Sequence, residues 1–305
     1  MVSCDCGVGE QMRQAYIKYI LSGLLFGLNG VVASYIALTS YEIVLLRLVL
    51  GSGLLLLVFL GSRQRFGFWQ HKRDMGYVVL SGVSMGASWL FVYEAYQQIG
   101  VSLASLAYYC GPVIVMVLSP LLFGEKLTWT KLTAFAAVLI GVFLVNGQAL
   151  VEGRNLWGLF CGGMSAVTYA VMVIFNKKAV QLTGLANTIL QMLAGLAVVA
   201  IFVASRQSLL LTIPDGSWLP VLVLGLVNTG VGCYWYFSSI GFLPVQTVAI
   251  LGYLELLSAV VFSVLLLHEV LLPMQLLGAL LILGGAVLGE CGLPKRRRQR
   301  AVKME

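Results

Sequence analysis

Long apolar runs separated by short polar connections are the feature that most restricts how this chain can fold. About 20 consecutive apolar residues carry a helix across the hydrocarbon core of a bilayer. Charged residues make up only 10% of the 305-residue chain, whereas soluble domains carry about 25%. Most of the surface must therefore face lipid, which predicts an integral membrane protein. Ten runs of sufficient length occur, at residues 14–38, 41–62, 75–97, 101–123, 130–149, 155–176, 183–205, 218–239, 244–267 and 273–290.

These ten runs are predicted to be helices. The strands of a membrane barrel would alternate apolar and polar residues over about 10 positions, and the chain lacks that pattern. A helix also satisfies every backbone amide within its own segment, as lipid requires. The first run is longer than the apolar core of a cleaved signal peptide, so we read it as a retained helix. The predicted fold class is an all-α integral membrane protein with ten transmembrane helices.

The positions of the basic residues predict the orientation in the membrane. With ten helices, both ends of the chain lie on one side. Sixteen Lys and Arg residues fall on that side, including those of the tail "KRRRQR" (295–300), against only Arg154 and Arg206 on the other. By the positive-inside rule, both termini are expected in the cytoplasm and the chain in the cytoplasmic membrane. The tail reads as an orientation signal rather than a nucleic-acid site, so no nucleic-acid partner is expected.

An internal repeat divides the chain into halves. Residues 105–145 align with residues 249–289 at an offset of 144, and the matches of glutamate and glycine carry more weight than those of leucine. Five helices per half is an odd number, so the second half must insert upside down relative to the first, as in many secondary transporters. The matched pairs include Tyr109 with Tyr253, Ser119 with Ser263, Glu125 with Glu269, and Gly141 with Gly285.

The predicted domain organisation follows from this repeat. A short cytoplasmic tail (1–13) precedes a first five-helix repeat (14–149). A second five-helix repeat (150–291) and a basic cytoplasmic tail (292–305) complete the chain.

The two halves resemble EamA-type carriers of the drug/metabolite transporter superfamily. The resemblance lies in "SLAYYCGPVIVMVLSPLLFGEKLTWTKLTAFAAVLIGVFLV" and "VAILGYLELLSAVVFSVLLLHEVLLPMQLLGALLILGGAVLG". Each phrase has an acid after an apolar helix, a short polar turn and a Gly-rich helix, and "LLRLVL" places Arg47 where the family usually has a basic residue. The resemblance implies ten helices, alternating access and a central cavity lined mainly by helices 1, 3, 4, 6, 8 and 9. Two departures are Leu256, where the family commonly has proline, and Glu94, which is outside the family pattern.

Glu125 and Glu269 end equivalent helices of the two halves. An acid in this position can accept backbone N–H bonds from the start of the next helix, where the helix dipole also favours negative charge. We interpret both as structural helix-end acids. The alternative is a gate latch or a coupling acid.

Glu255 lies about eleven residues into the ninth run, near the bilayer centre. An acid at that depth costs about 2.5–3.5 kcal/mol on insertion scales, so it needs a partner, a proton or a watery cavity. Glu255 is therefore a candidate for substrate binding or proton coupling, against a neutral acid packed between helices. Arg47 and Glu94 are further candidates for coupling or gating. Asn29 and Asn228 either bond across helices or contact substrate.

Aromatic residues mark the expected cavity. Trp89, Tyr93 and Tyr96 form one stripe at helical spacing, and Tyr96 is assigned to the interfacial belt with Trp129, Trp157 and Trp218. Ring faces and hydroxyls at mid-depth suit amphipathic organic solutes. The remaining aromatic candidates for substrate contact are Tyr109, Tyr169 and Tyr234, besides Trp89 and Tyr93.

These observations predict a secondary transporter that exports small organic metabolites, with amino acids or related amphipathic compounds as the first substrate class. An intramembrane enzyme would need a nucleophile–base pair or metal ligands at depth, but the two histidines lie near helix ends and no ligand motif occurs. No metal or other cofactor is expected. Protons are the candidate coupling ion, and the chain is expected to act as a monomer or homodimer. The alternative is a non-transporting scaffold, receptor or channel.

Overall fold

The computed structural model describes residues 3–62, 71–99, 104, 107–146, 156–206, 213–268 and 273–291. All regular secondary structure in these ranges is helical. The first half contains α1 (Ser3–Gly27), α2 (Asn29–Ser34), α3 (Ser40–Gly61), α4 (Lys72–Ile99), α6 (Gly111–Phe123) and α7 (Trp129–Asn146). The second half contains α8 (Leu156–Lys178), α9 (Gly184–Arg206), α10 (Trp218–Leu222), the π-helix η3 (Val223–Val231), α11 (Gly232–Ile240), α12 (Val245–Leu251), α13 (Leu254–Leu267) and α14 (Pro273–Cys291).

Seven segments in the described ranges are long and apolar enough to cross a membrane. They are Glu10–Ser34, Ser40–Gly61, Lys72–Ile99, Leu156–Lys178, Gly184–Arg206, Trp218–Ile240 and Val245–Leu266. Three shorter apolar helices, Gly111–Phe123, Trp129–Leu144 and Leu276–Gly285, coincide with the other three predicted spans. The count of ten spans stays a prediction.

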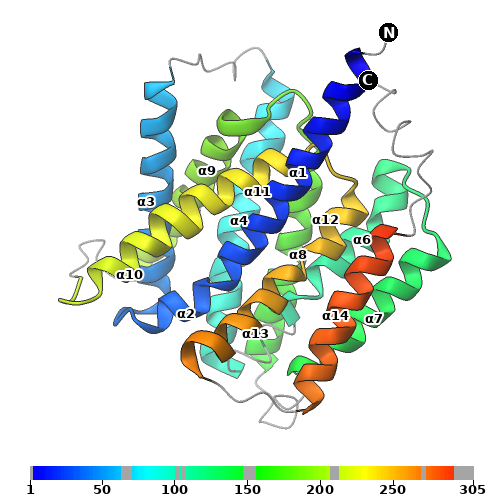
Figure 1. Cartoon of the computed structure of the whole chain (residues 1–305). Helices are drawn as coiled ribbons and strands as arrows, with labels where there is room; N and C mark the ends of the chain where they lie inside the picture. Colours follow the sequence, from blue (N-terminus) through cyan, green and yellow to red (C-terminus); the bar gives the residue numbers. More distant parts are fainter. Residues whose placement is uncertain are drawn as a thin grey trace.

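The helices form a bundle in which α1 crosses the front, beside α11 and α13 (Figure 1). Helix α4 packs against α8 and α9, and α3 packs against α9 and η3. Helices α7 and α14 form a separate pair at one edge of the bundle. Helix α1 begins and α14 ends on the same side, which we call the terminal side.

Glycines let two of these helix pairs approach to backbone contact. A Cβ added to Gly82 of α4 would lie 2.3 Å from the carbonyl oxygen of Gln191 in α9. In the α7–α14 pair, a Cβ on Gly141 would lie 2.6 Å from the Gly278 carbonyl oxygen. One on Gly285 would lie 2.6 Å from the Ala134 carbonyl oxygen. At the offset of 144 these last two contacts are equivalents of each other, so the repeat is also expressed in packing.

Each half contains a helix that is broken at the same point of the repeat. Helix α6 begins at Gly111 and Pro112, directly after turn residues Tyr109 and Cys110. In the second half, the segment containing α12 and α13 is interrupted at Gly252 and Tyr253. A break frees backbone carbonyls that lipid cannot satisfy, and the Tyr253 hydroxyl donates to the Tyr109 carbonyl oxygen at 2.8 Å.

Leu256 does not prevent the second break. Leu256 aligns with Pro112 at the offset of 144 and stands where a proline was expected from the resemblance. The interruption falls at Gly252–Tyr253, three to four residues earlier, just as the first-half break at Tyr109 and Cys110 precedes Pro112. Gly252 itself keeps right-handed helical backbone angles, with φ −57° and ψ −27°.

Candidate substrate-binding cavity

A cavity of about 750 Å³ lies inside the bundle. Its wall is built by α1, α2, α3, α4, α8, α11, the α12–α13 break and the turn that precedes α6. Gly30 and Gln97 line it and are exposed, so the cavity reaches solvent near the ends of α1 and α4 that lie away from the terminal side.

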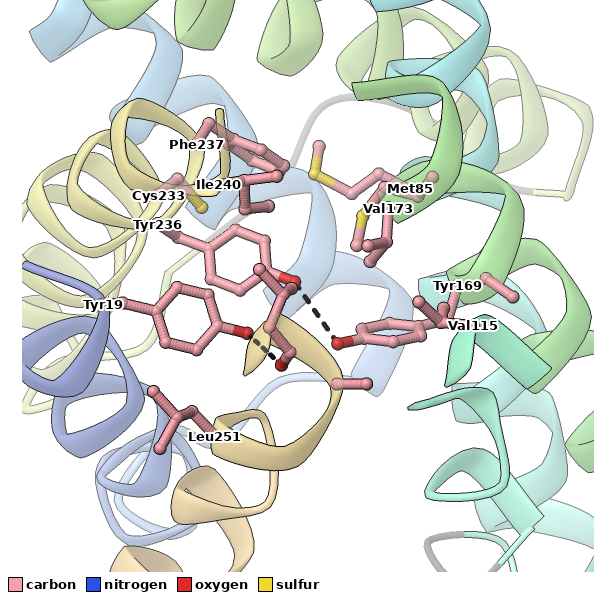
Figure 2. Packing of buried hydrophobic residues seen from close by; sticks show 14 of the residues in the cluster. Tyr19, Met85, Val115, Tyr169, Val173, Cys233, Tyr236, Phe237, Ile240 and Leu251 are labelled. Carbon is pink, nitrogen blue, oxygen red and sulfur yellow. Dashed lines mark hydrogen bonds between the residues drawn. The ribbon is translucent and has the colours of Figure 1, made fainter. Parts of the chain in front are cut away.

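Three buried tyrosines that line the cavity, Tyr19, Tyr169 and Tyr236, pack together at its other end, and Figure 2 shows their rings and hydroxyls close to one another. The Tyr19 hydroxyl donates to the Val248 carbonyl oxygen at 2.9 Å, and the hydroxyls of Tyr169 and Tyr236 lie 3.3 Å apart. The rings of Tyr19 and Tyr236 also contact, with centroids separated by 5.2 Å. We call Tyr19, Tyr169 and Tyr236 the tyrosine floor. The floor joins α1, α8, α11 and α12, and it separates the cavity from the terminal side.

Arg47 provides the positive charge of the cavity wall. Its side chain is only 5% exposed. The Nε–H group donates to Thr229 Oγ1 at 2.9 Å, and the guanidinium carbon lies 4.3 Å from the centroid of the Trp89 ring. A buried guanidinium with one hydrogen bond and one aromatic face retains N–H donors for a further acceptor.

The π-helix η3 holds the Thr229 hydroxyl in place for Arg47. Thr229 Oγ1 itself donates to the Leu224 carbonyl oxygen, five residues earlier, at 2.8 Å. The side chain of the next residue upstream, Asn228, donates to Asn29 Oδ1 and to the Leu25 carbonyl oxygen, each at 3.1 Å. Short π segments are frequent at functional sites, and this one ties α1 and α3 together beside the cavity.

Glu255 provides the negative charge of the wall, in the first turn of α13. The helix break places it there, because α13 starts afresh at Leu254 and its first-turn N–H groups favour an acid. Arg47 and Glu255 line the same cavity. Within the described residues, however, the two side chains form neither a hydrogen bond nor an ion pair within 4.0 Å of each other. Two opposite charges thus share one cavity without neutralising each other by direct contact.

Seven of the candidate residues named from the sequence line this cavity, and three do not. The lining candidates are Asn29, Arg47, Trp89, Tyr93, Tyr109, Tyr169 and Glu255. Asn228 is only 1% exposed, and its side chain donates to a backbone carbonyl of α1. This bond between helices is one of the two roles expected for it. Tyr234 lies under the Lys18 ammonium group, 5.7 Å from the ring centroid.

Glu94 lies outside the lining and belongs to a surface network. One carboxylate oxygen accepts bonds from Gln98 Nε2 and Trp157 Nε1, both at 3.1 Å, and the other accepts the Tyr41 hydroxyl. This network ties the end of α4 to α3 and α8. Trp157, which was expected to be an interfacial residue, is 53% exposed and in addition donates a hydrogen bond to Glu94.

Sequence reasoning missed part of the cavity. Tyr96 lines it and contacts Tyr93 edge-on, with ring centroids 5.3 Å apart, so it belongs to the cavity wall in addition to its expected place in the interfacial belt. Tyr236 rather than Tyr234 faces the cavity. The spacing of Cys233, Tyr236 and Phe237 could have indicated this, because positions i, i+3 and i+4 share one helix face.

Glu125 makes a contact that differs from the expected one. Its Oε1 accepts the Val245 N–H at 2.7 Å and its Oε2 accepts the Gln246 N–H at 3.1 Å. The acid therefore caps α12 in the second half instead of α7, the next helix. Glu269 lies outside the described residues. No group of three or more His, Cys, Asp or Glu in the described part of the chain could hold a metal ion.

Comparison with known families decides the assignment. The pattern of the EamA-like transporter family matches residues 13–147 and again residues 156–289. The chain belongs to the EamA-like transporter family. It contains the EamA domain twice, and with its membrane-spanning helices it is a multi-pass membrane protein.

Individual relatives agree with this EamA assignment. The "Uncharacterized transporter YxxF" of Bacillus subtilis (strain 168) is 24% identical over 257 residues, covering 83% of this chain and 82% of the relative. The "Probable amino-acid metabolite efflux pump" of Salmonella typhimurium (strain LT2) is 29% identical over 211 residues, covering 65% and 70%. One solved crystal structure superposes with a TM-score of 0.75 at 19% identity, covering 90% of this chain and 98% of the other, which supports the fold.

Proposed function

We propose that this chain is a secondary transporter that exports small organic metabolites across the cytoplasmic membrane by alternating access. It has ten transmembrane helices in two inverted five-helix repeats, 14–149 and 150–291, and both termini lie in the cytoplasm. The observation that carries the proposal is the 750 Å³ cavity in the bundle, where Arg47 and Glu255 line one space without pairing. A buried charge without a partner is costly, so its retention inside a cavity favours a role in binding.

The packing supports the inverted arrangement of the repeats. The contacts of Gly141 and Gly285 in the α7–α14 pair are equivalents at the offset of 144, and so are the helix breaks at Tyr109 and Tyr253. Inverted repeats with broken helices around a central site are a recurrent plan of secondary transporters. The direction of export is supported by the name of the Salmonella relative, an efflux pump.

The charges in the cavity support amino acids as the first substrate class. The guanidinium of Arg47 suits a carboxylate, and the carboxylate of Glu255 suits an ammonium group. The rings of Trp89, Tyr93 and Tyr109 offer faces for an amphipathic side chain. The name of the Salmonella relative, an amino-acid metabolite efflux pump, points in the same direction.

A binding panel followed by counterflow tests this function. Purified protein in nanodiscs is heated with amino acids, nucleosides and amines, and a ligand present at 100 times its Kd should stabilise the folded state by about 2.7 kcal/mol. Any stabilising ligand is then loaded into proteoliposomes, and entry of labelled ligand is measured against unlabelled ligand inside. A carrier shows saturable counterflow. Non-saturating flux would indicate a channel, and the absence of flux for every stabilising ligand would indicate a scaffold or receptor.

Arg47 offers a sharper test of the substrate class. Arg47→Gln should weaken binding of an amino acid about 10- to 100-fold, because hydrogen bonds to charged groups contribute about 1.5–3 kcal/mol, whereas binding of the decarboxylated amine should change little. Arg206→Gln is the control, since Arg206 does not line the cavity. Equal losses for the amino acid and its amine would argue against a carboxylate contact at Arg47.

A further inference from the structure

The connection between α11 and α12 is held in place by side chains from the rest of the bundle. We call residues 241–244 the α11–α12 corner. Before it, Lys177 Nζ of α8 donates to the carbonyl oxygens of Ile240 and Gly241, at 3.3 and 2.5 Å. After it, the Glu125 carboxylate accepts the first N–H groups of α12. A cation at a helix C-terminus and an anion at a helix N-terminus are both stabilised by the helix dipoles.

Gln246, just after the corner, bonds to side chains of α6 and α7. It is fully buried. Its Nε2 donates to Ser119 Oγ of α6 at 2.9 Å, and its Oε1 accepts from Lys131 Nζ of α7. Lys131 is therefore not a solvated surface cation, as its place among the basic residues suggested, but is only 5% exposed. Two residues further along α12, the Val248 carbonyl oxygen accepts the hydroxyl of Tyr19 in the tyrosine floor. Helix α12 therefore connects the corner to the tyrosine floor.

The repeat shows which of these contacts could also form between the equivalent residues of the two halves. In a carrier with inverted repeats, the two access states correspond to exchanged conformations of the halves. A contact that both halves can form stabilises both states equally, whereas a contact available to one half favours one state. Glu125 has an equivalent acid, Glu269, and Ser119 has Ser263. Lys131 does not have an equivalent base.

The positions equivalent to Lys131 and Gln246 are Gln275 and Ser102. Serine is too short to reproduce the reach of Gln246, and glutamine lacks the charge of Lys131. The Lys131–Gln246 bond joins the two halves, and the equivalent pair, Gln275 with Ser102, lacks the side chains to form it. It is formed in the state observed here, in which the terminal side is closed.

We propose that the bond between Lys131 and Gln246 sets the resting state of the carrier, by favouring the state that is closed on the terminal side. The proposal rests on the alternating-access function proposed above. A charge-assisted buried bond changes a two-state equilibrium on the order of tenfold or more. The side chains of the two halves thus make the two access states unequal in population.

The double variant Lys131→Gln with Gln246→Ser tests this proposal, because it places at each position the side chain found at the equivalent position of the other half. Spin labels are placed at Val180 and Phe242, which are 57% and 45% exposed on the terminal side, after the native cysteines are replaced. Distances are measured in nanodiscs without substrate. The unsubstituted chain should show mainly one short distance. The double variant should raise the population of a longer distance on the order of tenfold.

Lys126→Gln is the matched control, because Lys126 is an exposed lysine in the connection between α6 and α7. It removes a charge and should leave the distance distribution unchanged. A double variant with the unsubstituted distribution overturns the proposal, and so does an equal shift in the control. If the double variant does not fold, Gln246→Ser alone is measured by amide exchange across residues 241–246. Faster exchange supports the proposal, and unchanged exchange overturns it. If the double variant raised the population of the longer distance as expected but the unsubstituted chain showed no counterflow, the result would count against the transport function alone.

Discussion

Replacing Glu255 by glutamine is expected to abolish most saturable transport of the substrate. Glutamine keeps the size of the side chain but removes the negative charge that faces Arg47 across the cavity. An ammonium group of the substrate would lose a charge-assisted bond, which corresponds to about 10- to 100-fold in binding. A proton-coupled cycle would also lose its carrier of the proton, so the remaining flux should no longer depend on the pH gradient. Proteoliposome flux at several external pH values measures both effects.

The control for this variant is Glu94→Gln. Glu94 is also an acid of a membrane-spanning helix, but it bonds Gln98 and Trp157 outside the cavity lining. Its replacement should change stability more than substrate affinity. Glu255→Asp keeps the charge and should retain part of the transport. Unchanged flux and unchanged pH dependence in Glu255→Gln would contradict a role for this acid in binding or coupling.

Replacing Gly82 by alanine is expected to lower the melting temperature of the protein by several degrees. The added methyl group would lie 2.3 Å from the Gln191 carbonyl oxygen and 2.7 Å from the Ala194 side chain. Because the nearest atom belongs to the backbone of α9, the two helices must move apart. Overpacking of this kind costs about 1–3 kcal/mol, which outweighs the gain in helix propensity of about 1 kcal/mol.

Gly76→Ala provides the comparison, since Gly76 lies in the same helix and a Cβ there meets nothing within 4 Å. Its melting temperature should stay the same or rise slightly. Thermal unfolding of both variants in one detergent separates packing from propensity. If both variants melted alike, the close approach of α4 and α9 would not limit stability.

The candidate site could be predicted only in part. Glu255 and Arg47 stood out because an ionisable group inside an apolar run needs a special reason, and both line the cavity. Tyr19 did not stand out, and among the tyrosines of α11 the sequence pointed to Tyr234 instead of Tyr236. A membrane helix is apolar on its lipid-facing and its buried faces alike, so hydrophobic periodicity does not distinguish the cavity face. Tyr234 and Tyr236 differ only in the direction in which α11 turns them.

Glu125 is a second case in which the sequence marked a residue but not its contact. Its recurrence as Glu269 indicated an equivalent joint in two halves. The partner of Glu125 is α12, 120 residues further along the chain. No local pattern names such a partner, because the contact exists only after the two halves have packed.

By itself, the sequence determined that the chain is helical, crosses a membrane several times and is built from two related halves. Lipid imposes these properties segment by segment, since each apolar run must satisfy its own backbone amides. Only the tertiary structure decided which side chains share the cavity, that Arg47 and Glu255 line it without pairing, and that Lys131 bonds Gln246 across the two halves. These features depend on how the helices are rotated and paired, and that is settled by packing between segments far apart in the chain.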